Sequence, residues 1–227
     1  MSEVEQGLAQ LTKALLAGRA EDARHSTNAA LAQGSTTNEI LDVLVDAVNI
    51  IVDLNEVAEY DQAKLTATEE AATACLQTIE PKLQTTEGRF NVKATTGPVG
   101  VSAGNLLSMA MSASLRSVGF HSTNLGKTQT ALDLLRNSEE LGADLVIPLL
   151  SDERVEEQLR NFIESFEKGG FKTKFAVISV APGLPGNVQV AIPVARNTGE
   201  AISQATEWAV KRQRKNLTLA DRVSGTN

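Results

Sequence analysis

Residues 144–150 read Asp-Leu-Val-Ile-Pro-Leu-Leu, and this short apolar run decides the fold. A helical pattern over 130–141 precedes it and ends at Gly142, and a second helical pattern over 155–168 follows it. An almost wholly apolar run of this length between two amphipathic helices is typical of a strand buried in a parallel sheet. Proline has no N–H to give to a strand ladder, so Pro148 predicts that the strand ends close to it.

The same alternation of strand and helix continues on both sides of this run and predicts five strands and four helices. Such a chain forms a doubly wound parallel sheet with helices on both faces and with ligand-binding loops at the carboxyl ends of the strands. The expected strands are 90–94, 119–125, 144–150, 173–180 and 188–192, and the expected helices are 103–117, 130–141, 155–168 and 198–214.

The first 85 residues show helical patterns only. Apolar residues recur at helical spacing in four stretches, and Gly18, Gly34 and Pro81 end three of them. Four antiparallel helices with short turns predict a small helical bundle. We therefore expect a bundle domain at 1–83, a polar linker at 84–89 and an α/β domain at 90–227. The four expected helices cover approximately 8–16, 21–33, 40–52 and 61–79.

The composition excludes several classes of protein. A net charge of −7 and an aromatic content of 4% argue against a nucleic-acid binder, and the basic run 211–215 is interpreted as a solvated helix end. One cysteine and two histidines are too few for a disulfide, a multi-cysteine zinc site or a three-histidine site. The chain shows neither a signal peptide nor an apolar run of spanning length, so we expect a cytoplasmic protein without a membrane partner.

The segment 95–104 is the candidate binding loop, because it contains three glycines beside the start of a helix. Small residues let a bulky ligand approach the backbone, and the N–H groups of a helix start favour a phosphate or another anion. A phosphorylated small molecule and a tight structural turn both remain open at this point. His121 is expected on the second strand, away from this loop, and His25 on the polar face of the second helix.

The order of bundle, linker and α/β domain resembles the corrinoid proteins of cobalamin-dependent methyltransferase systems. The resemblance covers nearly the whole chain, and it implies a flavodoxin-like (Rossmann-type) five-stranded parallel sheet after a four-helix bundle. It also implies a cobalamin or another corrinoid as cofactor. The residues that carry the resemblance are Glu59-Tyr60, Gly119-Phe120, Leu125-Gly126, Gly142-Ala143-Asp144 and Gly199-Glu200-Ala201.

The chain departs from this family at its metal-binding motif, Asp-x-His-x-x-Gly, whose histidine is the lower ligand of cobalt. Alignment from the first strand places Pro98 and Gly100 at the Asp and His positions, and alignment from Gly119-Phe120 places Ser102 and Gly104 there. Neither alignment supplies an imidazole. We therefore expect no metal-ligating residue, so the cobalt would be water-ligated, keep its own base or have no lower ligand.

The resemblance also assigns cofactor contacts after the third and fourth strands, where the family has Ser-x-Leu and Gly-Gly. The full set of expected cofactor-binding residues is Gly97, Gly100, Ser102, Gly104, Asn105, Leu149, Leu150, Ser151, Ser179, Ala181 and Gly183.

The function implied is that of a methyl carrier, not a stand-alone enzyme. Its partners would be a substrate methyltransferase and a methyl-acceptor methyltransferase, and the sequence also allows a homodimer. Two alternatives remain open. One is a cofactor-free interaction or sensor module that kept the fold, and the other is an enzyme acting on a phosphorylated ligand, for which no general base is evident near the loop.

Overall fold

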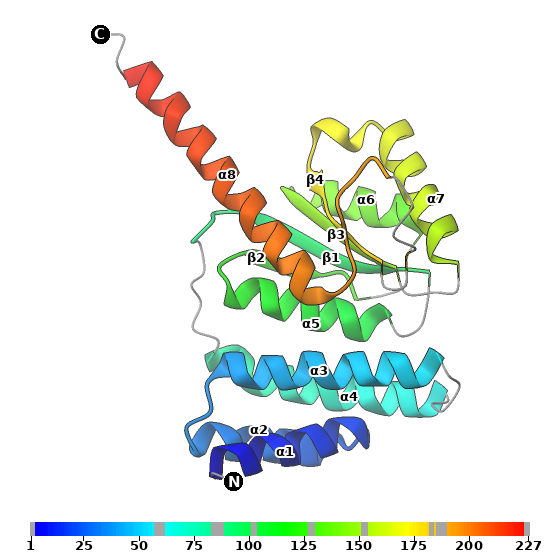
Figure 1. Cartoon of the computed structure of the whole chain (residues 1–227), viewed down its shortest axis with the longest axis vertical. Helices are drawn as coiled ribbons and strands as arrows, with labels where there is room; N and C mark the ends of the chain where they lie inside the picture. Colours follow the sequence, from blue (N-terminus) through cyan, green and yellow to red (C-terminus); the bar gives the residue numbers. More distant parts are fainter. Residues whose placement is uncertain are drawn as a thin grey trace.

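The structure is a computed structural model that describes residues 3–56, 62–82, 89–100, 104–126, 130–150, 154–181, 184 and 190–224. Its element order confirms the predicted fold class: helices alone come first, and a parallel sheet alternating with helices follows (Figure 1). No helix among these described residues is long and apolar enough to cross a lipid bilayer.

The helical part begins the chain. It consists of α1 (Glu3–Leu16), α2 (Ala20–Ala32), α3 (Thr37–Glu56), α4 (Gln62–Ile79) and the short 3₁₀ helix η1 (Glu80–Lys82). The start of α3 carries a capping box: the Glu39 N–H donates to the Thr36 hydroxyl at 3.2 Å, and the Thr36 N–H donates to the Glu39 carboxylate at 2.8 Å.

The sheet has the strand order β2-β1-β3-β5-β6, and every pair of neighbours is parallel. This order is the flavodoxin-like arrangement. The strands are β1 (Lys93–Val99), β2 (His121–Asn124), β3 (Leu145–Leu150), β4 (Ala176–Val177), β5 (Ser179–Val180) and β6 (Val194–Ala195). The remaining helices are α5 (Gly104–Ser117), α6 (Ala131–Glu140), α7 (Val155–Lys168), the 3₁₀ helix η2 (Phe171–Thr173) and α8 (Thr198–Ser224).

Several expected boundaries were wrong, and three in the α/β part differ most. The first strand is 93–99 and not 90–94, so residues 95–99, the first half of the expected glycine-rich loop, are in the strand. The last strand is 194–195 and not 188–192, because 190–192 are not in a strand and 185–189 lie outside the described residues. The last helix continues to Ser224, ten residues beyond the expected end at 214.

Pro148 does not end β3 but interrupts the neighbouring strand. The N–H of Ile178 donates to the carbonyl of Val146, so residues 146 and 148 direct their backbone polar groups toward β4 and β5. Pro148 has no N–H to give on that side, and the pairing stops at Val146–Val177 and resumes at Leu149–Val180. The strand expected at 173–180 is therefore split into β4 and β5, while the pairing of Pro148 with Gly97 of β1 is kept.

The helices cover the sheet on both faces. Helices α5 and α8 pack on one face together with the bundle, and α6 and α7 pack on the other (Figure 1). The side chains of β3 alternate accordingly: Leu145, Ile147 and Leu149 belong to the core on the α5 side, whereas Val146 and Leu150 belong to the core on the α6 and α7 side.

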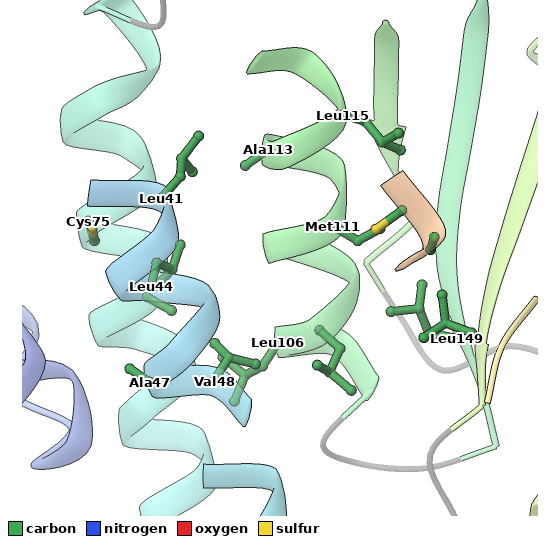
Figure 2. Packing of buried hydrophobic residues seen from close by; sticks show 14 of the residues in the cluster. Leu41, Leu44, Ala47, Val48, Cys75, Leu106, Met111, Ala113, Leu115 and Leu149 are labelled. Carbon is green, nitrogen blue, oxygen red and sulfur yellow. The ribbon is translucent and has the colours of Figure 1, made fainter. Parts of the chain in front are cut away.

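Helix α5 is buried between the bundle and the sheet. Figure 2 shows Ala113 of α5 on the side of α3, and Met111 and Leu115 on the side of the strands. Leu44 and Val48 of α3 belong to the same continuous core as these residues. The helical part therefore shares its core with the α/β part, and α5 is the element common to both.

We predict that Leu44→Ala lowers the free energy of unfolding by about 2–5 kcal/mol, because it removes a buried side chain and leaves a cavity. Leu44 is 1% exposed, whereas Ile50 on the same helix is 41% exposed, so Ile50→Ala is the matched control and should change stability by less than about 1 kcal/mol. Urea unfolding followed by circular dichroism measures both. An unchanged midpoint for Leu44→Ala would contradict the shared core.

Candidate functional site at the carboxyl ends of the strands

The carboxyl ends of the central strands meet at one edge of the sheet, as parallel pairing requires. Val99 at the end of β1 pairs with Leu150 at the end of β3, and Leu149 pairs with Val180 at the end of β5. Those expected cofactor contacts that the structure describes all lie at or near this edge. Ser102, Ser151 and Gly183 lie outside the described residues.

Gly97 and Gly100 were both expected in one binding loop, but the structure places only Gly100 after the strand. Gly97 is inside β1, and a Cβ atom there would lie 2.6 Å from a terminal methyl of Leu134 on α6. Gly100 follows β1 with φ at +99°, and a Cβ atom there would lie 2.6 Å from the amide nitrogen of Gln158 on α7. Both glycines thus permit close packing of β1 against the helices of the α6 and α7 face.

Gly104 and Asn105 form the first turn of α5, and Asn105 links this turn to the bundle. Its side-chain amide N–H donates to the carboxylate of Glu69 on α4, and the same nitrogen lies 3.8 Å from the sulfur of Met109. Burial, helped by the neighbouring charge of Glu70, raises the pKa of the Glu69 carboxyl. The amide oxygen of Asn105 is buried, and within the described residues it accepts no hydrogen bond.

The ends of β3 and β5 contribute mainly apolar groups. Leu149 faces the α5 side of the sheet and Leu150 the opposite side, and both are buried. Ser179 begins β5, and Ala181 follows it with its N–H bonded to the carbonyl of Ala195. The Ser179 hydroxyl is buried and has no hydrogen-bond partner in the part of the chain that is described. Among the described residues, the side-chain oxygens of Asn105 and Ser179 at this edge are therefore buried without a hydrogen-bond partner.

A polar network that sequence reasoning missed ties β1, α5 and β2 together near the same edge. The Ser108 hydroxyl donates to the side-chain oxygen of Asn124 at 2.6 Å and also lies 3.1 Å from the hydroxyl of Thr96. The Asn124 oxygen accepts a second bond from the Gly126 N–H at 3.0 Å. This network fixes the position of α5 against the two strands, but no periodicity in the sequence indicates it.

Metal-binding side chains do not gather in the described part of this edge. No group of three or more His, Cys, Asp or Glu residues able to hold a metal ion occurs within the described ranges. His121 is exposed and opens β2 opposite Lys93, at the amino end of the sheet, and His25 is exposed on α2. Cys75 of α4 is a buried free thiol, and burial raises its pKa to about 11. The placements of both histidines agree with the sequence interpretation.

Comparison with known proteins gives similarity of structure only. No protein-family model matches the chain, and no curated protein sequence matches it. Among solved structures, the monomethylamine corrinoid protein of Methanosarcina barkeri shares 14% sequence identity with a TM-score of 0.68, and the match covers 89% of this chain and 98% of that one. The predicted resemblance to the fold of corrinoid proteins is thereby confirmed.

Two further solved structures match at lower TM-scores. A cobalamin-binding protein from Desulfitobacterium hafniense has 13% identity and a TM-score of 0.47, with 88% of this chain and 98% of that chain covered. The methanol:cobalamin methyltransferase complex of Methanosarcina barkeri has 13% identity and a TM-score of 0.43, with 91% and 80% covered.

We predict that Gly100→Ala destabilises the protein by about 1–3 kcal/mol, because alanine is strained at this positive φ and its Cβ would displace Gln158. Gly34→Ala is the matched control: φ there is +95°, but a Cβ atom would meet nothing within 4 Å. Chemical denaturation should therefore show a larger loss for Gly100→Ala. Equal losses would mean that the contact with Gln158 costs nothing.

We further predict a pH-dependent difference between the wild type and Glu69→Gln. Because the pKa of Glu69 is raised on folding, the native state binds an extra proton as the pH falls through that pKa, above the value of about 4.3 for an unfolded glutamate. The wild type should gain stability relative to Glu69→Gln in that window.

Urea unfolding at about pH 7.5 and about pH 5 measures this difference. Glu70→Gln is the control, because it removes only the smaller cause of the raised pKa of Glu69. In that variant the stability gained between about pH 7.5 and about pH 5 should remain close to the gain of the wild type. A difference between wild type and Glu69→Gln that does not change with pH would refute the assignment.

Proposed function

We propose that this chain binds a corrinoid at the carboxyl ends of β1, β3 and β5, beneath the bundle, and serves as a methyl carrier without a protein lower ligand. The observation that carries the proposal is the agreement of fold over 89% of the chain with a corrinoid protein of a methylamine system. The corrinoid would lie at the carboxyl-end edge of the sheet, where ligands of doubly wound sheets bind.

The residues of this edge fit a corrinoid in part. Gly100, which follows β1, is exposed, and the buried oxygens of Asn105 and Ser179 could accept hydrogen bonds from amide groups of a ligand. The donor set does not fit histidine ligation, because both histidines of the chain lie elsewhere. The fit therefore favours a corrinoid held by its periphery.

A bound corrinoid would supply the methyl-accepting cobalt, and the chain would bind it, orient it and control access to it. Asn105 stands where the first turn of α5 meets α4, so it would position ligand and bundle together. Apolar Leu149, on the α5 side of the sheet, would keep water from the floor of the site. Transfer to and from a substrate methyltransferase and a methyl-acceptor methyltransferase would need the bundle to move aside.

We propose domain limits of 1–83 and 90–227, with 84–89 as the linker about which this movement occurs. The movement costs free energy, because it breaks the hydrogen bond between Asn105 and Glu69. It also exposes the apolar surface that α3 and α5 share. Partner binding would have to compensate for that exposure.

A cofactor-free interaction or sensor module is the second candidate function. The packing of Leu134 against Gly97 and of Gln158 against Gly100 favours it, since both contacts fill space beside β1 with the protein's own side chains. The absence of an imidazole near the described part of this edge is equally expected for such a module.

The deciding experiment is incubation of the purified protein with hydroxocobalamin, followed by gel filtration and visible spectroscopy. The proposal predicts that corrinoid co-elutes with the protein in about equimolar amount. After reduction to Co(II), electron paramagnetic resonance should show no splitting from a histidine nitrogen. The matched control is the histidine-free double variant His25→Ala, His121→Ala, which should retain the corrinoid with an unchanged spectrum because both side chains are exposed and remote.

Two results would overturn the proposal in different ways. Loss of the corrinoid on the column would favour the cofactor-free module. Retention with a spectrum that changes in the histidine-free variant would mean that a histidine of this chain ligates cobalt.

A further inference from the structure

A cavity of about 620 Å³ lies at the other end of the sheet from the candidate site. It is bounded by β4, by the residues leading into β6, by the end of α7 and by α8. Strand β4 pairs with Leu145 and Val146, the first residues of β3, which places the cavity toward the amino ends of the strands. Its volume is within the range of small-molecule sites.

The walls of the cavity are aromatic and aliphatic. Phe166 and Phe175 line it, and their ring centroids are 6.1 Å apart in a stacked arrangement. Phe175 also stacks on Phe171 at 5.8 Å, so its ring is held from two sides. Ile178 and Ile192 complete the apolar surface. The rings are therefore fixed before any ligand binds and form an ordered apolar wall against which another ring can pack.

Helix α8 presents a different kind of surface to the cavity. Gln204, Glu207, Trp208 and Lys211 all line it, and their spacing of three and four residues puts them on one face of the helix. The buried alanines at 201, 205 and 209 occupy the face that packs on the core. The cavity-facing side of α8 therefore carries polar groups and the only tryptophan of the chain.

Trp208 is held in place by a chain of charged contacts behind it. The Arg212 guanidinium lies 5.4 Å from the centroid of the indole ring, and its nitrogen is 2.7 Å from a carboxylate oxygen of Asp144. The other oxygen of Asp144 accepts the backbone N–H of Lys93 at 3.0 Å. These contacts anchor the indole to the sheet, and a wall that is ordered before binding lowers the entropic cost of binding.

The sheet is open at the cavity. Among the described strands, β4 pairs with β3 only, because β6 begins opposite Ser179 of β5. The N–H groups of Ala176 and Ile178 point toward β3, so the backbone polar groups of Val177 point to the opposite, cavity side. A ligand in the cavity would meet backbone polar groups as well as aromatic faces.

The charged residues lining the cavity are two lysines and one glutamate. Lys172 pairs with Glu167 at 2.7 Å, and Lys211 is 3.7 Å from Glu207. Lys211 and Lys172 are 78% and 58% exposed, so both ammonium groups are free to turn toward a ligand at the rim. Arg212 beside Trp208 is paired with Asp144 and is not part of the cavity lining. Exposed ion pairs contribute little to stability, so the ammonium group of either lysine can exchange its carboxylate partner for an anionic group of a ligand.

We propose that this cavity binds a flat aromatic anion, with the ring between Trp208 and Phe175 and the anionic group near Lys172 and Lys211. The site is separate from the proposed corrinoid site, and the proposal holds whether or not a corrinoid binds. It assigns a role to Trp208, Lys172 and Lys211, none of which the methyl-carrier function uses.

The probe for the test is 1-anilinonaphthalene-8-sulfonate, a flat aromatic sulfonate that fluoresces in apolar surroundings. Titration of the native full-length chain should give saturable binding with a dissociation constant in the tens of micromolar, roughly what a ligand of this size reaches. Because Trp208 is the only tryptophan, its emission should be quenched by energy transfer in parallel with the rise of probe fluorescence.

Charge-reversal variants locate the site. Lys172→Glu and Lys211→Glu should each weaken probe binding by about threefold to tenfold. Lys215→Glu, one turn further along α8 and outside the cavity lining, is the matched control and should leave the affinity unchanged. The uncharged analogue N-phenyl-1-naphthylamine should bind more weakly than the sulfonate to the wild type.

Three results would overturn the proposal. These are the absence of saturable binding, equal affinities of the Lys172→Glu, Lys211→Glu and Lys215→Glu variants for the sulfonate, and equal affinity of the wild type for the sulfonate and its uncharged analogue. Near-ultraviolet circular dichroism of each variant checks that the aromatic packing is intact.

Discussion

The burial of α5 on two sides is the constraint on which the rest of the structure depends. Most surface helices bury one stripe, but α5 packs against the sheet through Met111 and Leu115 and against the bundle around Ala113. Small residues on this helix, serines and alanines among them, let the neighbouring layers come close. The bundle is consequently stacked on the sheet through one helix, and the start of that helix is also where the candidate site begins.

The architecture was predictable because it follows from the spacing of apolar residues along the chain. The apolar run at 144–150 and the helical patterns around it specify a doubly wound sheet, and the structure has one. What failed were the short elements. The strand expected at 188–192 proved to be 194–195, two residues long, and so short a strand is specified by its neighbours and not by its own sequence. Pro148 was read as a strand end because sequence does not reveal toward which neighbour its missing N–H would point.

From the sequence we could predict which edge of the sheet holds the candidate site, but not which side chains contact one another there. Parallel pairing guarantees that residues following β1, β3 and β5 converge, so Gly100, Leu150 and Ala181 could be grouped in advance. The partners that the structure adds, Glu69 for Asn105 and Gln158 for Gly100, come from helices far away in sequence. Such tertiary contacts leave no local pattern, and neither residue type nor spacing signals them.

The state of Cys75 has a practical consequence. A thiol that is fully buried, with its pKa raised to about 11, is almost entirely protonated at neutral pH, and the thiol form does not react with maleimides or disulfides. It is the only cysteine of the chain, so the native protein should show almost no reaction with thiol-specific labels. Pairs of cysteines introduced on exposed positions of the helical and α/β parts could therefore carry spin labels or dyes without removing a native residue. Distances between such labels would report directly on any separation of the bundle from the sheet.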